Sequence, residues 1–222
     1  MQFIHNLQKL WYSCILKINK KSECEKYRKL KIKDVSSIKQ SDLPQEFSDN
    51  AFKVVDDFIR KTINLDYEIL LYFDYTTGEI LRCAIGEKTT VELEFEYDEF
   101  DGKHVASIHN HTKDMYTPPS DKNFGIFLRQ WEDYELIAAH NGLWILKGKL
   151  KDEKLNFELK INSQTLFNMV FDYYSKKCEN INERNDEIDR EYGKLLSKYI
   201  NNKIIKEIQL EKKEYYDDNK NC

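Results

Sequence analysis

Glycine and proline are scarce in this chain, with seven and three residues among 222. Low-complexity linkers and disordered segments are rich in such residues and poor in hydrophobic ones, whereas this chain is 41% hydrophobic and 13% aromatic. The sequence therefore predicts a folded chain, long enough for one catalytic-sized domain with extensions.

Cysteine pairs and long apolar runs are missing as well. The five cysteines are odd in number and no two form a C-x-x-C motif, so the sequence predicts neither a disulfide framework nor a thiolate zinc site, and it favours a reducing compartment. The apolar segment from Leu10 to Ile18 is interrupted by Lys17 and is shorter than the ~20 residues that span a bilayer. We therefore expect a soluble, cytoplasmic protein without a membrane partner.

Charge is unevenly distributed, although the net charge is only -4. Residues 1–40 carry ten Lys or Arg against three Asp or Glu, whereas residues 92–101 carry six acids and no base. The basic segment could contact nucleic acid or anionic lipid, but a solvated lysine-rich face is the favoured interpretation. The acids alternate with apolar residues over 91–97, which predicts a half-buried strand whose acidic face meets a basic partner or protects a sheet edge.

Hydrophobic periodicity predicts both helices and strands. Helical spacing is found over 49–62, after Ser120, and from Ser163 as far as Ile208, and one or two helices are expected in the first forty residues. The C-terminal pattern indicates a helical hairpin or a dimerisation arm rather than a regular coiled coil. Strands are predicted at 68–74, 79–85, 91–97, 105–111, 134–138 and 143–149, the first two joined by a turn at Thr76-Thr77-Gly78.

His109-Asn110-His111 is the first pattern that suggests chemistry. Residues i and i+2 of a strand project to the same side, so both imidazoles could approach one metal ion. A catalytic zinc site has three protein ligands and an open position for water, so a third ligand must come from elsewhere. Ser120 is well placed as the N-cap of the following helix, whose first turn could reach back toward the metal.

The run Ile108-His109-Asn110-His111, then eight residues, then Ser120, with a helix and two strands after it, resembles the JAB/MPN (JAMM) metallopeptidase family. The Ile-His-Asn-His sequence is most similar to that of the bacterial RadC-type branch, and the resemblance covers residues 67–149. The family motif is a glutamate on an earlier strand, H-x-H, a short spacer and S-x-x-D. The resemblance implies zinc held by His109 and His111, with Glu68 as the general base and Ser120 stabilising the oxyanion.

Two residues depart from the family motif. Thr112 replaces the proline that often follows the second histidine, and Asn123 stands where the family has its aspartate ligand. An amide oxygen is a weaker zinc ligand than a carboxylate. Asp121 is the alternative third ligand, although that register puts Pro118 in the place of the serine.

The expected fold is α/β (α+β), a mixed sheet flanked by helices. By its resemblance the domain at 46–160 would be JAB/MPN-like, that is, cytidine-deaminase-like. A basic helical arm at 1–45 and a helical extension at 161–222 complete the predicted domains.

The expected activity is zinc-dependent hydrolysis of a peptide or isopeptide bond in a protein substrate, including a bond to a ubiquitin-like modifier. The alternative is a weakened or inactive JAB-like pseudoenzyme, which binds proteins or forms a homo-oligomer through its C-terminal helices. Outside the family resemblance, Glu68 could be a solvent-facing strand residue and Ser120 only a helix cap. A nucleic-acid role ranks last, because the chain has no stacking-aromatic motif, zinc finger or helix-turn-helix signature.

Overall fold

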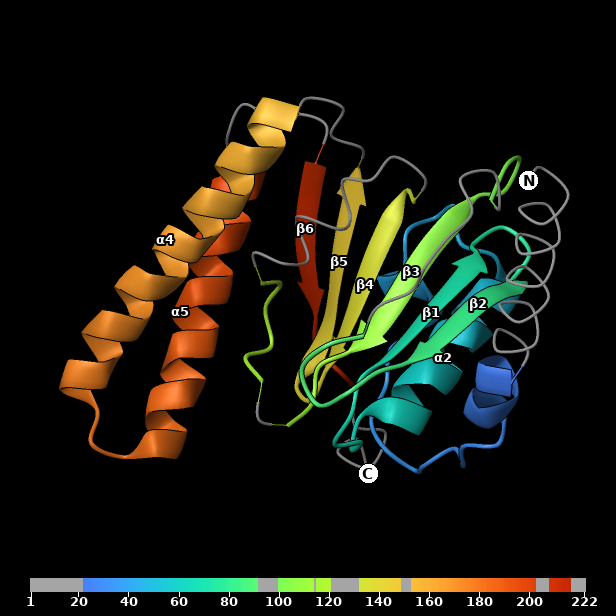
Figure 1. Cartoon of the computed structure of the whole chain (residues 1–222), viewed down its shortest axis with the longest axis horizontal. Helices are drawn as coiled ribbons and strands as arrows, with labels where there is room; N and C mark the ends of the chain where they lie inside the picture. Colours follow the sequence, from blue (N-terminus) through green and yellow to red (C-terminus); the bar gives the residue numbers. More distant parts are fainter. Residues whose placement is uncertain are drawn as a thin grey trace, which may run out of the picture.

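One mixed, open sheet of six strands organises the molecule, in the order β2-β1-β3-β4-β5-β6 (Figure 1). The computed structural model describes residues 22–91, 100–113, 115–120, 132–148, 153–202 and 208–216. β3 and β4 are parallel, and all other neighbouring strands are antiparallel. The strands are β1 (Ile69–Asp74), β2 (Ile80–Ile85), β3 (Val105–Asn110), β4 (Tyr134–Ala139), β5 (Gly142–Gly148) and β6 (Ile208–Lys213).

Helices pack on both faces of this sheet, near one edge on one face and near the opposite edge on the other. The described helices are the short η1 (Gln40–Asp42), α2 (Asp49–Thr62), α4 (Glu153–Lys177) and α5 (Ile181–Asn202), and residues 22–28 are also helical. Figure 1 shows α2 beside β1 and β2, and the α4–α5 pair beside β6. The predicted mixed α+β fold with flanking helices is therefore confirmed at the level of its architecture.

The predicted helix at 49–62 coincides with α2. Ser48 accepts a hydrogen bond from the backbone N–H of Ala51 at 3.1 Å and so caps the helix, while Arg60 and Lys61 lie in its last turn, where cations are favourable. The apolar side of α2 packs on Ile69, Leu71 and Phe73 of β1 in the main core. This side of the sheet is called the α2 face below.

The described part of the N-terminal segment belongs to the same core. Tyr27, Ile38 and Leu43 are buried with the α2 side chains and β1. The predicted boundary between an arm at 1–45 and a domain from 46 therefore does not separate two packed units, because apolar side chains on both sides of it share one core. Residues 1–21 lie outside the described part of the chain.

Two features of the C-terminal region differ from the prediction. The helix predicted to continue to Ile208 ends before β6, and Ile208 and Leu210 are buried while Gln209 is exposed, which is the alternation of a strand. β6 pairs with β5 from Ile208 to Lys213, so the region 161–222 is not entirely helical and completes the sheet. The helical interpretation was wrong there because two isoleucines four residues apart fit a helix as well as a strand edge.

The predicted helical hairpin is confirmed. α4 begins at Glu153, ten residues before Ser163, and packs against α5, which in turn covers the sheet face opposite to α2 through Ile188 and Leu196. Within α5, Ile188 is buried, whereas Ile181, seven residues earlier, is 61% exposed. No described helix is long and apolar enough to cross a bilayer.

Two predicted elements lie outside the described residues. Of the alternating strand predicted at 91–97, only Val91 is described, because residues 92–99 are outside the described ranges. The helix predicted after Ser120 falls on residues 121–131, which are also outside them. The remaining predicted strands agree with β1 to β5 within two residues at each end.

Candidate metal centre

β3 and the residue after it place two histidines on one face of the sheet. His109 lies in β3, and the N–H of His111 donates to the carbonyl of Ala138 at 3.0 Å, so the extended backbone continues beside β4. Both rings are buried, and their centroids are 5.2 Å apart at an interplanar angle of 53°. The predicted same-side arrangement of the two histidines is therefore present.

A backbone carbonyl fixes the tautomer of His111. Nδ1 of His111 lies 2.7 Å from the carbonyl oxygen of Tyr116. A carbonyl only accepts hydrogen bonds, so Nδ1 carries the proton and the lone pair of the ring is on Nε2. This is the arrangement by which proteins orient metal-binding histidines.

His109 faces an acid on the neighbouring strand. Its Nδ1 lies 3.6 Å from Oε1 of Glu135 in β4, and both side chains are buried. A carboxylate on the far side of the imidazole is the second common way to orient a metal-binding histidine. Glu135 was not among the predicted site residues, although an acid inside the apolar run Tyr134–Ala139 is a signal that could have identified it.

Both histidines are held in the neutral form that binds metals. Burial lowers the pKa of His111 to about 4. Burial also lowers the pKa of His109 well below its usual range, and the nearby His111 adds to this shift. A metal ligand must be deprotonated, so at neutral pH neither ring has to lose a proton before it binds.

Glu68 directly precedes β1, and continuation of the strand register puts it on the same face. The register of β1 and β3 pairs Leu70 with His109, and its continuation by two residues brings Glu68 opposite His111. Opposed side chains of antiparallel strands project from the same face. Glu68 is only 4% exposed, so the alternative of a solvent-facing strand residue is wrong.

Asn110 holds the backbone on both sides of Glu68. Its Oδ1 accepts from the N–H of Ile69 at 2.7 Å, and its Nδ2 donates to the carbonyl of Tyr67 at 3.0 Å. The middle residue of the His-Asn-His run therefore has a positional role toward Glu68. The sequence singled out the run but gave no role to its asparagine, because the pairing of β1 with β3 joins residues that are 41 positions apart.

The loop after His111 carries the remaining predicted site residues. Thr112, which stands where the family often has proline, is buried and donates from Oγ1 to the carbonyl of Lys88 at 3.2 Å, so a hydrogen bond tethers the start of this loop. Ser120 ends the described part of the loop and is partly buried. Asp121 and Asn123, the two candidates for the third ligand, lie outside the described residues, as does the helix that Ser120 would cap.

The side chains that are described fit a divalent transition metal as a partial site. Neutral imidazoles are ligands that zinc prefers, and one of the two, His111, is oriented by a hydrogen bond of its Nδ1 atom. Within the described ranges no three His, Cys, Asp or Glu side chains form a group suited to a metal ion. Asp121 and Asn123, the residues predicted to complete the site, lie outside these ranges.

A second buried acid, Glu132, lies near Glu135. Glu132 and Glu135 are both nearly inaccessible to solvent. Burial raises the pKa of Glu132 well above its usual range, and the neighbouring Glu135 raises it further, while Ser107 acts in the opposite direction. Neither acid was predicted as a site residue.

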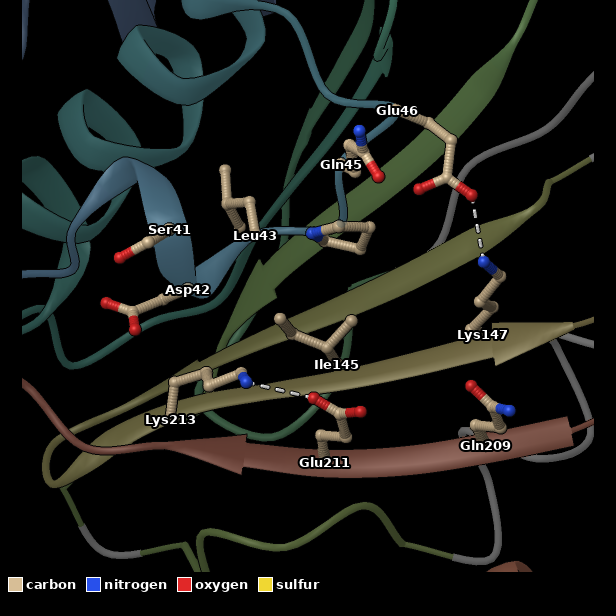
Figure 2. Close-up of a pocket in the computed structure, with 11 residues that line it drawn as sticks. Ser41, Asp42, Leu43, Gln45, Glu46, Ile145, Lys147, Gln209, Glu211 and Lys213 are labelled. Carbon is tan, nitrogen blue, oxygen red and sulfur yellow. Dashed lines mark hydrogen bonds and ion pairs between the residues drawn. The ribbon is translucent and has the colours of Figure 1, made fainter.

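A pocket of about 260 Å³ lies on the α2 face, away from the histidines. Ile145 forms its floor, and Figure 2 shows its charged walls already paired, with Lys147 on Glu46 at 2.9 Å and Lys213 on Glu211 at 3.0 Å. Charges that satisfy each other attract a ligand weakly, so the pocket offers no chemistry comparable to the histidine site.

Comparisons with known proteins add no assignment. No family model, curated protein or solved structure matches the chain.

Proposed function

We propose that the chain is a zinc-dependent hydrolase of the JAB/MPN type that cleaves a peptide or isopeptide bond, with a ubiquitin-like modifier as one substrate class. The observation that carries the proposal is the arrangement of Glu68, His109 and His111 on one face at adjacent strand ends. Zinc would be held by the two histidines and by Asn123 or Asp121.

Each side chain would have a distinct role in hydrolysis. Zinc, when bound, lowers the pKa of water to about 7 and polarises a carbonyl oxygen. Glu68 would accept the proton that the attacking water loses and pass it to the leaving amine, because a buried carboxylate beside the site is suited to general acid-base transfer. Ser120 would donate a hydrogen bond to the oxyanion that develops on the substrate carbonyl.

Elemental analysis of the purified protein tests the metal site. Wild type is expected to carry zinc in stoichiometric amount, and His109→Ala should lose it, whereas His104→Ala, outside the site, should retain it. If wild type carries no zinc but Asn123→Asp acquires it, the chain has kept the arrangement of the metal ligands and has lost zinc-dependent hydrolysis. Absence of zinc from both would end the proposal.

A second candidate function is supported by the outer surface of α4. Large apolar side chains four or eight residues apart are exposed along it, namely Phe157, Ile161, Met169 and Tyr173. Interfaces are enriched in aromatic residues and methionine, and between Ile161 and Phe171 this helix carries no charged residue. The alternative is therefore a pseudoenzyme that pairs with a second copy through α4.

Light scattering after size exclusion distinguishes this alternative. A dimer in wild type that becomes a monomer in Met169→Lys, but not in the equally exposed Lys160→Ala, would support pairing through α4. A monomeric wild type at the highest soluble concentration would contradict it. The result is independent of zinc content, so both candidate functions can be judged from the same preparations.

A further inference from the structure

α5 reaches the candidate metal centre from 72 residues further along the chain. The peptide unit between Tyr116 and Thr117 links the two. Its carbonyl accepts the Nδ1 hydrogen bond of His111 at 2.7 Å, and its N–H donates to the two carboxylate oxygens of Asp189 at 3.0 and 3.2 Å. Asp189, one peptide unit and His111 therefore form a continuous hydrogen-bonded chain.

The Tyr116–Thr117 peptide unit can affect both the direction and the strength of the hydrogen bond to His111. A peptide unit is planar and rigid, so a group that holds its N–H also fixes the direction of its carbonyl. Hydrogen bonds to an ionised carboxylate are about twice as strong as neutral ones, and bonds in a chain polarise one another. Asp189 therefore aims the carbonyl that holds His111 and makes it a better acceptor.

The same side of α5 holds the loop at two further points. Asn185, Asp189 and Tyr192 follow the i, i+4, i+7 spacing of one helix face. The hydroxyl of Tyr116 donates to Oδ1 of Asn185 at 3.5 Å, and the hydroxyl of Tyr192 donates to the carbonyl of Pro119 at 3.0 Å. The loop between the histidines and Ser120 is thus attached to α5 at Tyr116, Thr117 and Pro119.

We propose that Asp189 is a positioning residue for His111, through which the α4–α5 hairpin sets the geometry of the metal centre. Asp189 does not touch His111, and it acts only through the Tyr116–Thr117 peptide unit. The inference rests on the proposed function for its consequence, zinc affinity, but the orientation of the His111 ring exists without metal and can be measured separately.

Nitrogen NMR of the metal-free full-length protein tests the orientation. His111 should be the Nδ1–H tautomer in wild type, and Asp189→Ala should convert it to a mixture or to the Nε2–H form. Asp189→Asn keeps an acceptor of the same shape without charge, so it should retain the tautomer and shift the Nδ1 proton signal upfield. Asp186→Asn, the same change at an exposed site on α5, should alter neither.

Zinc titration of the same variants tests the consequence. Asp189→Ala should raise the Kd for zinc about 10-fold, at the low end of the 10- to 100-fold loss seen when groups that orient metal ligands are removed. Asp189→Asn should raise it less, which is a partial rescue by the conservative variant. Asp186→Asn should leave it unchanged.

The outcomes separate the two proposals. An unchanged tautomer together with a wild-type Kd in Asp189→Ala overturns the positioning role, and if that variant does not fold, an unchanged Nδ1 proton signal in Asp189→Asn overturns it. A wild type that binds no zinc overturns the proposed function, whereas a changed tautomer in that same protein still supports the positioning role of Asp189.

Discussion

At the residue scale, the side chains of the candidate metal centre are held by different groups. A backbone carbonyl orients His111, His109 faces Glu135, and Asn110 fixes the backbone around Glu68. Single substitutions at these residues can therefore be compared for their effects on metal binding, proton transfer and protein stability.

Substitution of Glu68 by Gln should abolish turnover without removing zinc. Glu68 is expected to move a proton and not to bind the metal, and general acid-base groups contribute about 10²- to 10⁴-fold to the rate. We therefore expect kcat to fall at least 100-fold, with zinc content by elemental analysis unchanged. Glu79→Gln, an exposed acid near the same hairpin, serves as the control, and a wild-type rate in Glu68→Gln would exclude the role of base.

His111 should make the metal-free protein sensitive to acid. Its pKa is about 4 in the folded state against an ordinary value of 6.5, so the unfolded chain takes up the proton first as the pH falls. The stability that neutral His111 gives is complete above pH 6.5 and is lost between pH 6.5 and 4, by about 3 kcal/mol in total at 1.36 kcal/mol per pKa unit.

Urea unfolding of wild type and His111→Asn between pH 4 and 7, with a chelator present, measures this effect. The difference in unfolding free energy between the two proteins should shift in favour of the variant as the pH falls. If the unfolding free energies of the two proteins changed in parallel with pH, His111 would not be buried in its neutral form.

At the element scale, α5 approaches the sheet closely at Gly193. A Cβ there would lie 2.6 Å from Cη2 of Trp144 and 3.3 Å from Cγ of Pro118. Alanine has the higher helix propensity by about 1 kcal/mol, yet overpacking costs about 1–3 kcal/mol and should dominate. We expect Gly193→Ala to lower the unfolding free energy in urea, and to weaken zinc binding because Pro118 belongs to the loop held by α5.

Lys194→Ala is the matched control for this substitution, since it changes an exposed neighbour on the same helix. It should alter the unfolding free energy by less than about 0.5 kcal/mol. A stabilised Gly193→Ala would mean that α5 has room to move away from Trp144.

β6 provides a second test at this scale. Leu210 is buried against α5 and the sheet, whereas its neighbour Gln209 is exposed, so Leu210→Ala should cost about 2–4 kcal/mol and Gln209→Ala less than about 0.5. Chemical denaturation of both variants gives the comparison. Equal effects would contradict the pairing of β6 with β5.

At the scale of the whole molecule, zinc should stabilise the fold, because His109 and His111 are buried and held in their neutral forms only when the chain is folded. Free zinc at 100 times its Kd should add about 2.7 kcal/mol of stability. We expect Tm to rise with zinc and to return to the apo value after a chelator, with no response in His109→Ala. A wild-type Tm that does not change on addition of zinc would favour the second candidate function.

The described parts of both terminal segments are packed into the fold. Residues near the N-terminus share the core with α2, and β6 closes the sheet after the helical hairpin. The hairpin then holds the loop between His111 and Ser120. Removal of the C-terminal 60 residues would therefore disturb both the sheet and the candidate site.

The sequence by itself determined the features that depend on local spacing. The 3.6-residue period located α2, short apolar segments bounded by turn residues located five of the strands, and the alternation of side chains along a strand put His109 and His111 on one side. Glu68 was singled out as the base by the family resemblance, and the register of β1 and β3 is what brings it beside His111.

Only the tertiary structure decided which distant residues meet. Glu135 faces His109 because β4 lies parallel to β3, and Asp189 reaches the Tyr116–Thr117 peptide unit because α5 packs back over the sheet. Ile208 is in a strand because an open edge of β5 was available to pair with it. Such contacts follow from how the chain closes on itself, and a periodicity measured over a dozen residues carries no information about partners 72 positions away.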